Sequence, residues 1–446
     1  MEKIKSKKYY RIEFVLDSPL MIGAKQKERT DQDLLTDVCG KPFIPGSSLA
    51  GIYRSRLLME EGEEKMYFGD VPDYEEWEES RKQKGSQTQK ESKTNSAENK
   101  SSRIIVYDAV LKTGEKPHIT RRDFVALDEY KTAKQGSKFD AEILEPGVSF
   151  VTFIEQNRYG EDRLVAEEIA QLWHSGQIRI GAKTMRGFGA VREVKISCAE
   201  FRLSEKEEAK KWLKFDLSAD GGWTEWKPVK ELSDSCSVKL TLELQGAVSV
   251  RRYTTDIAKD KNKSPDQEQL TVFENEKKCP VIPGSTWAGA FKSHMKKLIP
   301  ELNLDYFGYV DDSENKKCKS KIRFSESKIT GGKDKLLSRN AIDRFAGGTV
   351  NQALFMEKVY YGGVSELEIG FDRTIDEKML AGLAALIMDL HYGFLSIGGA
   401  TSVGRGLFKI LAIDGKKLFN SGKETDSLYQ EIVQILTKKR NGGSGN

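Results

Sequence analysis

Two polar loops carry acidic residues just upstream of nearly identical turns. The first reads TDQDLLTDVCGKPFIPG and contains Asp31, Asp33 and Asp37; the second reads SPDQEQLTVFENEKKCPVIPG and contains Asp266 and Glu268. Asp31 and Asp266 each begin a triplet of Asp, Gln and an acid. A carboxylate can hold a hydrated Mg²⁺ beside RNA and help to cleave it, although acids in polar loops are more often simply solvated. Asp31 and Asp266 are therefore the positions where such chemistry would lie, with a solvated loop as the simpler interpretation.

The turns that follow these loops, PGSS and PGST, stand where a helix is expected to begin. Free N–H groups at a helix start attract anions, including phosphates, and basic residues follow one to two turns later. An ordinary helix cap is the simpler interpretation, but the presence of both features in two copies favours phosphate contact. The resulting candidate RNA-binding residues are Gly46, Ser47, Ser48, Arg54, Gly284, Ser285, Thr286 and Lys292.

Two glycine-rich loops, IGAKTMRGFGAV at 180–191 and IGGATSVGRGLF at 397–408, lie near the end of each copy. Each precedes a strand, so the order strand, GxGxxG, helix of a dinucleotide site is absent. GxG alone is often only a tight turn. Glycine loops with basic residues can also cradle a single-stranded phosphate backbone. On that interpretation the RNA-binding residues here are Lys183, Arg186, Gly187, Gly404 and Arg405.

These motifs belong to a long internal repeat. Residues 42–56 read PFIPGSSLAGIYRSR and residues 280–294 read PVIPGSTWAGAFKSH, so both contain PxIPGS followed by AG. Four further pairs keep the same order, which indicates a tandem duplication. They are 66–70 with 305–309, 103–111 with 321–329, 125–144 with 340–359, and 180–191 with 397–408.

Each copy shows the same coarse order of elements. It opens with a strand of alternating apolar residues, continues through the turn and a helix, and has a second helix before the glycine-rich loop. Strands mixed with two helices predict an α+β fold, a ferredoxin-like sandwich in each copy. The blocks 125–144 and 340–359 resemble protruding hairpins. The predicted boundaries are a first domain at 1–202, a linker at 203–235, a second domain at 236–420, and a C-terminal helix and flexible tail at 421–446.

One segment stands apart from this pattern. Between residues 80 and 102 the only apolar residue is Ala97, and there is no aromatic residue. Such a segment cannot bury enough surface to offset its conformational entropy. We expect a largely disordered insertion at 71–102.

The composition excludes several classes of protein. The 446 residues carry 72 Lys and Arg against 68 Asp and Glu, a net charge of +4, so nucleic-acid binding must rely on local patches. No stretch approaches the roughly 18–20 apolar residues of a membrane span, and the N-terminus lacks the apolar region of a secretory signal. Five scattered cysteines without a CxxC pair indicate free thiols in a reducing cytoplasm. The four histidines show no metal-binding spacing.

Taken together, the paired IPGSSLAGIYRS and IPGSTWAGAFKS segments, the hairpin blocks and the two glycine-rich loops resemble the RAMP superfamily of CRISPR-associated proteins. The resemblance covers most of both copies and omits 71–102 and 203–235. The likeness is greatest to the backbone subunits of type III effector complexes, and a fused pair of such domains resembles the double-backbone subunit of III-D-like systems.

The resemblance implies an RRM-related fold with thumb hairpins that holds a guide crRNA and meets target RNA beside other effector subunits. In cleaving members a loop aspartate acts with a divalent metal, Mg²⁺ or Mn²⁺, so the chain would be a metal-dependent endoribonuclease at Asp31 and, with its longer loop, Asp266. A non-catalytic guide-binding subunit is the main alternative. A guide-processing nuclease with histidine chemistry is another, although His174 and His391 look like packing residues. The last is a protein-binding module without RNA.

Overall fold

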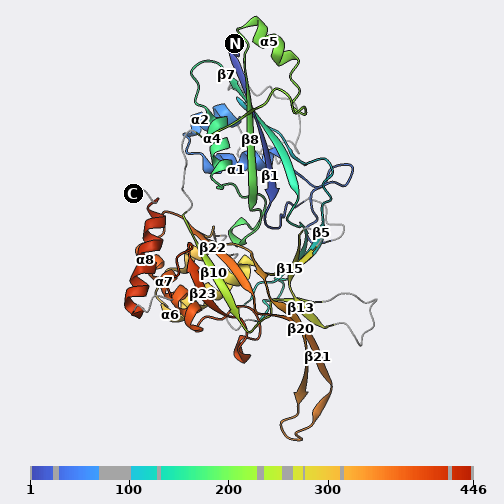
Figure 1. The fold of residues 1–446 in the computed structure, drawn as a ribbon, viewed down its shortest axis with the longest axis vertical. Helices are drawn as coiled ribbons and strands as arrows, with labels where there is room; N and C mark the ends of the chain where they lie inside the picture. Colours follow the sequence, from blue (N-terminus) through green and yellow to red (C-terminus); the bar gives the residue numbers. More distant parts are fainter. Residues whose placement is uncertain are drawn as a thin grey trace, which may run out of the picture.

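The computed structural model describes residues 3–23, 30–69, 102–127, 132–228, 236–253, 265–274, 277–311, 316–419 and 424–442. The two copies form two units stacked along the long axis of the molecule (Figure 1). The insertion expected at 71–102 lies outside the described residues except for its last position. None of the described helices combines the length and apolar character needed to cross a bilayer. The five cysteines carry free thiols.

The first unit contains the following elements. Its helices are α1 (Gly46–Arg56), α2 (Glu61–Phe68), α4 (Val165–His174), α5 (Lys206–Leu213) and the 3₁₀ turn η1 (Thr184–Arg186). Its strands are β1 (Ser6–Leu16), β2 (Phe43–Ile44), β3 (Ile104–Val106), β4 (Ala109–Leu111), β5 (Ile119–Phe124), β6 (Phe139–Leu144), β7 (Ser149–Arg158), β8 (Val191–Arg202) and β9 (Thr224–Glu225).

The second unit repeats this plan and extends it. Its helices are α6 (Gly284–Leu298), α7 (Glu377–Tyr392), α8 (Thr425–Arg440) and the 3₁₀ turns η2 (Leu304–Phe307) and η3 (Thr401–Val403). Its strands are β10 (Ser237–Gln245), β11 (Ala247–Val248), β12 (Arg251–Tyr253), β13 (Gln267–Gln269), β14 (Thr271–Glu274), β15 (Lys277–Ile282), β16 (Tyr309–Asp311), β17 (Lys316–Cys318), β18 (Ile322–Phe324), β19 (Ser327–Thr330), β20 (Lys333–Ile342), β21 (Thr349–Tyr361), β22 (Val364–Phe371) and β23 (Leu407–Ile413).

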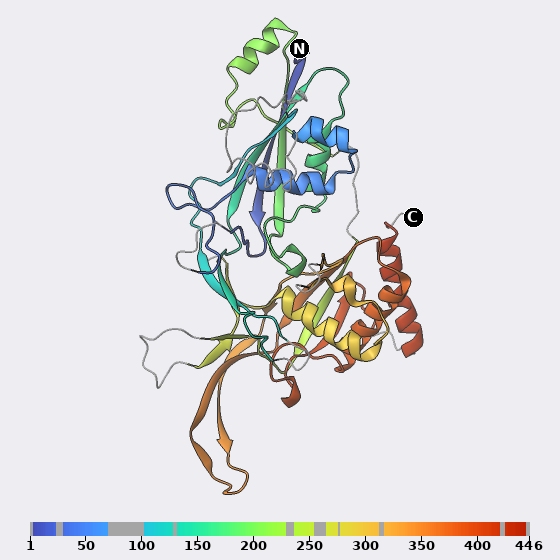
Figure 2. The same ribbon diagram turned by 180° about the vertical axis from the view of Figure 1, so that it is seen from behind.

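The main sheets of the two units have equivalent strand orders. The first runs β2-β4-β7-β1-β8-β9 with β3 beside β7, and the second runs β14-β15-β19-β22-β10-β23 with β18 beside β22. The central strand is β1 in one and β10 in the other, each antiparallel to both neighbours. Viewed from behind, α1 and α6 lie on the same side of the molecule (Figure 2). The predicted α+β fold in two tandem domains is confirmed.

The cores follow from the alternation noted in the sequence. Tyr10, Ile12, Phe14 and Leu16 of β1 are buried, and so are the alternate residues of β10. Helices cover one face of each sheet because they present apolar stripes at helical spacing. In α4 the buried side chains include Trp173, whose indole N–H donates to the Tyr53 hydroxyl of α1 at 3.0 Å. This bond satisfies two large polar-tipped side chains inside an apolar core.

The described part of 203–235 extends the first unit. Helix α5 follows β8, and the Trp212 indole N–H donates to the Tyr9 hydroxyl at 2.9 Å. Phe215 packs against Tyr9 and against Trp223, with ring centroids 5.4 and 5.1 Å apart. Strand β9 pairs with β8 at the edge of the sheet. Residues 203–228 therefore belong structurally to the first unit.

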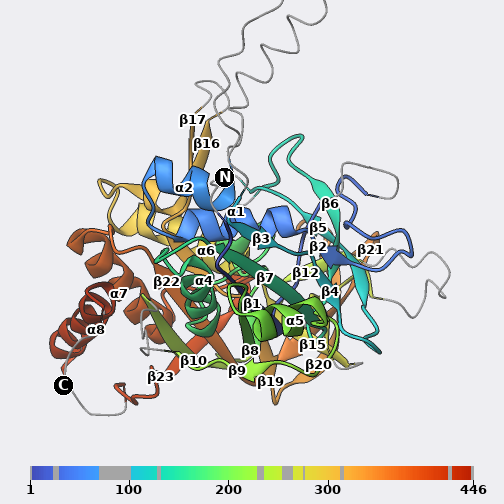
Figure 3. The same ribbon diagram turned by 90° about the horizontal axis from the view of Figure 1, so that it is seen from above.

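The two hairpins differ in their surroundings. Viewed from above, both lie on the side of the molecule opposite α7 and α8 (Figure 3). The β20–β21 hairpin extends away from its sheet and carries exposed apolar residues, among them Phe345 at its tip. The shorter β5–β6 hairpin instead leans against the second unit, where His118 stacks on Phe273 with ring centroids 3.9 Å apart. Both begin before the predicted blocks, at residues 119 and 333.

The two units meet where the first glycine-rich loop lies on the second PGS turn. A Cβ on Gly187 would stand 2.3 Å from the backbone nitrogen of Glu326, and a Cβ on Gly284 would stand 2.4 Å from the carbonyl oxygen of Arg186. Only glycine permits so close an approach of two backbones. Around this contact Arg122 and Glu326 form an ion pair at 2.7 Å, with 6% and 3% of their side chains exposed. We call this contact region the joint.

We predict that Gly187→Ala destabilises the protein more than Gly404→Ala. Gly404 is the counterpart of Gly187, has a similar positive φ of 80°, and has no atom within 4 Å of its added Cβ. Gly404→Ala should cost about 1 kcal/mol of unfolding free energy from backbone strain, and Gly187→Ala about 2 kcal/mol more from overlap with Glu326. Urea unfolding of both variants measures the difference. Equal losses of unfolding free energy would contradict the close contact of Gly187 with Glu326.

Candidate nucleic-acid interface and aspartate sites

Asp31 is exposed and is tied to strand β6 of the first hairpin. Its backbone N–H donates to Asp140 Oδ1 at 2.9 Å, and the Asp140 N–H donates to Asp31 Oδ2 at 3.0 Å. The neighbouring Gln32 pairs in parallel with Ala141 of β6, so the loop runs beside the hairpin as a short extra strand. This reciprocal pairing fixes the position of the Asp31 carboxylate.

Two more charged groups belong to the first aspartate site. Arg121 of β5 forms an ion pair with Asp140 through Nη2 and Oδ2. The pKa of Asp140 is held below its usual range, first by the N–H of Asp31 and then by the Arg121 charge, against the opposing effect of desolvation. Asp140 is therefore ionised at neutral pH. The site gathers two carboxylates and one guanidinium.

Asp266 holds the corresponding place in the second unit. It is exposed, its N–H donates to the Met356 carbonyl at 2.8 Å, and its Oδ2 accepts from the Met356 N–H at 2.8 Å. Met356 lies in β21, as Asp140 lies in β6. The two predicted aspartates thus occupy equivalent positions beside the returning strands of the two hairpins.

The donors at these positions suit a hydrated cation to different degrees. Mg²⁺ is commonly held by one or two carboxylates together with waters and phosphate oxygens. At the first site Asp31 keeps one carboxylate oxygen for a cation beside the Asp140–Arg121 pair, whereas Asp266 faces Met356, which brings no carboxylate. Among the described residues no group of three or more His, Cys, Asp or Glu could hold a metal alone. The first site fits a cation shared with a phosphate.

The PGS turns begin α1 and α6 without side-chain caps. Pro45 and Pro283 are the N-cap residues, and no hydroxyl of the turns accepts a capping hydrogen bond. In the first unit Gly46 N–H instead donates to Asp108 Oδ1 at 2.7 Å. Ser47 and Ser285 are exposed at the two helix starts.

Several of the predicted RNA-binding residues converge at the joint. Arg186 donates to the Phe307 carbonyl at 2.7 Å, and burial lowers its pKa. The Lys183 ammonium lies 4.6 Å from the ring centroid of Phe124 and 4.7 Å from that of Phe139. Burial lowers the pKa of Lys183, and the Arg186 charge lowers it further. These contacts hold two cations beside the start of α6.

Lys292 adds to the same group of charges. Its ammonium donates to the Gly308 carbonyl at 3.1 Å. Its pKa is lowered first by burial and then by Arg186, with smaller contributions from Lys134 and Lys296, while Asp305 opposes the shift. Lys134 comes from the apex of the first hairpin, so cations of both units act on one place. Mutual repulsion of this kind marks a site that an anion would stabilise.

Three further predicted residues lie away from the joint. Arg54 forms an ion pair with Glu64 of α2 at 2.6 Å. Gly404 is open to solvent in the second glycine-rich loop. Arg405 is buried, and its Nη1 donates to Glu357 Oε2 at 2.7 Å. Arg54 and Arg405 are therefore already paired within the chain.

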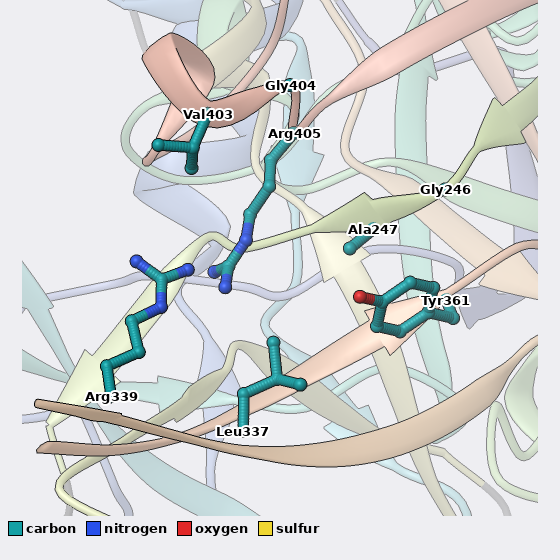
Figure 4. Close-up of a pocket in the computed structure, with 8 residues that line it drawn as sticks. All are labelled: Gly246, Ala247, Leu337, Arg339, Tyr361, Val403, Gly404 and Arg405. Atoms are coloured by element: carbon teal, nitrogen blue, oxygen red, sulfur yellow. The ribbon is translucent and has the colours of Figure 1, made fainter.

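A cavity of about 550 Å³ opens beside Arg405 (Figure 4). Its lining comes from β11, the β20–β21 hairpin and the second glycine-rich loop, and includes Leu337, Arg339 and Tyr361. In the first unit the corresponding loop and hairpin carry Gly187 and Arg122, which contact Glu326 in the joint. The second unit presents the same docking face, with no described residue of the chain covering it.

Comparison with known proteins agrees with this duplicated architecture. A family model described as the RAMP superfamily matches residues 13–192 and 221–409. The chain belongs to the RAMP superfamily. Each matched segment holds one PGS turn, one hairpin and one glycine-rich loop, so the chain carries two RAMP domains.

The other comparisons add little to this. One solved structure that matches is "Cryo-EM structure of the Type III-B Cmr-beta bound to cognate target RNA", with a TM-score of 0.29 and 15% sequence identity. That match covers 43% of this chain and 60% of the other chain, a likeness too slight to carry an argument. No curated protein matches the chain.

Sequence reasoning missed the partners of both the aspartates and the arginines. Arg121 and Asp140 were not singled out, nor was Glu357, the buried acid that pairs with Arg405. Only Glu357 left a local signal, as an acid within the largely apolar stretch ALFMEKV. A charge at an inward-facing strand position needs a partner, and that expectation could have found Glu357.

We predict that Arg405→Ala acts through stability. The substitution leaves Glu357 buried without its closest cation, which should lower the unfolding free energy by about 3 kcal/mol. Lys409→Ala, at an exposed position of β23 in the same RAMP domain, is the matched control and should cost less than about 0.5 kcal/mol. Thermal unfolding measures both. Unchanged stability in Arg405→Ala would show that the pair contributes nothing and that Arg405 is free for RNA.

Proposed function

We propose that this RAMP protein is a guide-RNA-binding backbone subunit of a type III CRISPR ribonucleoprotein that cleaves complementary target RNA. The observation that supports it best is the equivalence of Asp31 and Asp266. Each is an exposed carboxylate fixed against a hairpin by a hydrogen bond from a strand N–H. A duplicated chain that keeps one exposed acid beside each hairpin could act at regular intervals along a bound RNA.

The guide RNA is proposed to pass over the joint. Lys183, Arg186 and Lys292 are held there beside the exposed Ser285 at the start of α6, and each has a pKa lowered by burial. A phosphate would relieve this mutual repulsion and could also accept from the helix start. The joint is thus the place in the described chain where both predicted phosphate-binding motifs meet.

Other effector subunits are the proposed protein partners. The open face around Gly404 and Arg339 corresponds to the face that the first unit buries in the joint. A contact of this head-to-tail kind leaves complementary surfaces at the two ends of the chain. A neighbouring RAMP domain would therefore meet the second unit as the second unit meets the first.

In the proposed cleavage step the aspartates act beside the displaced target nucleotide. The hydrogen bond from the Asp140 N–H holds the Asp31 carboxylate in place and leaves its second oxygen for a cation or a proton. A bound Mg²⁺ or Mn²⁺ would supply charge stabilisation at the scissile phosphate. The residues that would hold it are Asp31 in the first domain, with Asp140 adjacent, and Asp266 in the second.

A guide-binding subunit without cleavage is the second candidate, and one observation favours it. In both aspartates one carboxylate oxygen accepts a hydrogen bond from a strand N–H. This structural role is sufficient to explain an acid at each position. Histidine-based guide processing is less well supported. His391 accepts a hydrogen bond from the Ile410 N–H and stacks on Phe419, so it serves packing.

We predict that the tagged protein purified from its native cells carries short RNAs with one repeat-derived end and a variable spacer. Phosphate contacts at the joint should make their retention sensitive to salt. Sequencing of the bound RNA, with Lys183→Glu/Lys292→Glu as the charge-reversed comparison, measures this. Bound RNA of random cellular origin, or no RNA at any salt concentration, would remove the guide-binding function.

We predict that Asp31→Asn abolishes one cut in the target RNA while the fold is kept. Asparagine can still accept the Asp140 N–H through its side-chain oxygen but loses the charge. Asp266→Asn should abolish the second cut, and Asp37→Asn, an exposed acid of the same loop that caps local N–H groups, should change neither. Cleavage is read on end-labelled target with the reconstituted complex. Two unchanged cuts in Asp31→Asn/Asp266→Asn would leave the non-catalytic subunit as the function.

A further inference from the structure

We propose that Arg121 contacts the scissile phosphate at the first aspartate site, and that the two RAMP domains cleave unequally because the equivalent strand position of the second domain holds leucine. This inference rests on the proposed function and names a residue and an asymmetry within it. It depends on the arrangement of Arg121, Asp140 and Asp31 beside the β5–β6 hairpin.

The geometry links an exposed guanidinium to the backbone of Asp31 through the Asp140 carboxylate. Arg121 Nη2 bonds Asp140 Oδ2, while the other oxygen of Asp140 accepts the Asp31 N–H at 2.9 Å. The Arg121 side chain is 63% exposed, whereas that of Asp140 is 12% exposed. A guanidinium carries five N–H donors in a planar fork, so one arm can hold Asp140 while another faces an incoming phosphate.

The other charged residues around this hairpin are committed elsewhere. Glu142, next on the same face of β6, accepts the Leu34 N–H at 3.1 Å and so holds the loop. Lys138 lies 3.8 Å from Asp123 on the neighbouring strand. Among the described residues of the site, Arg121 is the cation joined to Asp31 through a single intervening side chain.

The strand register shows what stands in these places in the second domain. Asp140 pairs with Asp123, two residues after Arg121. In the second domain Met356 takes the place of Asp140, because its N–H binds the Asp266 carboxylate. Met356 pairs with Ser338, which follows Leu336 by two residues. The second domain therefore has methionine in place of the second carboxylate and leucine in place of the guanidinium. The nearby Lys358 is paired with Asp334 at 2.8 Å.

The chemistry gives this difference a direction. Negative charge builds up on the phosphate oxygens as an RNA strand is cut, and a fixed cation stabilises that charge more than it stabilises the bound substrate. Asp140 keeps the Arg121 side chain oriented before substrate arrives. The first site has this help, whereas the described strand position equivalent to Arg121 in the second domain is Leu336, so the cut opposite Asp31 should be the faster.

The test measures single-turnover rates at both cut positions in the full reconstituted ribonucleoprotein with Mg²⁺. We expect the cut governed by Asp31 to be about 100-fold faster than the cut governed by Asp266, and Arg121→Ala to remove about 100-fold from the first rate. Affinity for the target should stay unchanged, and Arg121→Lys should restore part of the rate. Lys138→Ala, on the same hairpin, is the matched control.

A change in the substrate separates contact with phosphate from a merely structural role. Sulfur in place of a non-bridging oxygen of the scissile phosphate weakens a hydrogen bond from a guanidinium. If Arg121 contacts that phosphate, the sulfur slows the first cut in the unmodified protein more than it slows the same cut in Arg121→Ala. If Arg121 serves only to hold Asp140, the sulfur slows both proteins by the same factor, and the proposal is overturned.

The outcomes distinguish this inference from the function on which it rests. Equal rates at the two positions, or an unchanged first rate in Arg121→Ala, overturn the role of Arg121 and leave guide binding and cleavage standing. Absence of both cuts in a complex that still binds guide and target overturns the cleavage function and, with it, this inference.

Discussion

The backbone contact between Gly187 and the Glu326 segment, together with that between Gly284 and Arg186, is the constraint on which the arrangement of the two units depends. Two polypeptide backbones approach this closely only where side chains are absent. Once they do, the start of α6 lies against the first glycine-rich loop, and Arg186 reaches the Phe307 carbonyl of the second unit. The concentration of positive charge at the joint is a consequence of that contact, because Lys183 and Arg186 come from one unit and Lys292 from the other.

The glycine-rich loop has a different role in each of the two units. Gly189 and Gly406 make the same close turn. At either position a Cβ would stand 1.8 Å from a carbonyl oxygen of the same loop. Gly187 and Gly404 share a positive φ, yet one is covered by a neighbouring unit and the other faces solvent. The duplicated loop is therefore one structural device whose role depends on what lies against it.

Local pattern predicted much of the fold and part of the sites. Alternation identified the central strands β1 and β10, and the second helix expected before each glycine-rich loop is present as α4 and α7. Spacing also identified Asp31 and Asp266 as equivalent positions. Local pattern could not reveal that Arg405 is buried against Glu357, because that pair joins strands brought together only by the tertiary fold. Arg121 and Asp140 could not be identified for the same reason. Asp140 contacts Asp31, which lies 109 residues earlier in the chain.

Placing both RAMP domains on one chain changes the thermodynamics of the joint. Two separate domains would have to give up translational and rotational freedom to meet, and the occupancy of the joint would vary with their concentrations. On one chain the encounter is intramolecular, so the joint forms at an effective concentration that dilution does not alter. The ratio of one Asp31 site to one Asp266 site, and their order along any bound strand, are then set by covalent connection and cannot drift with the expression level of the protein.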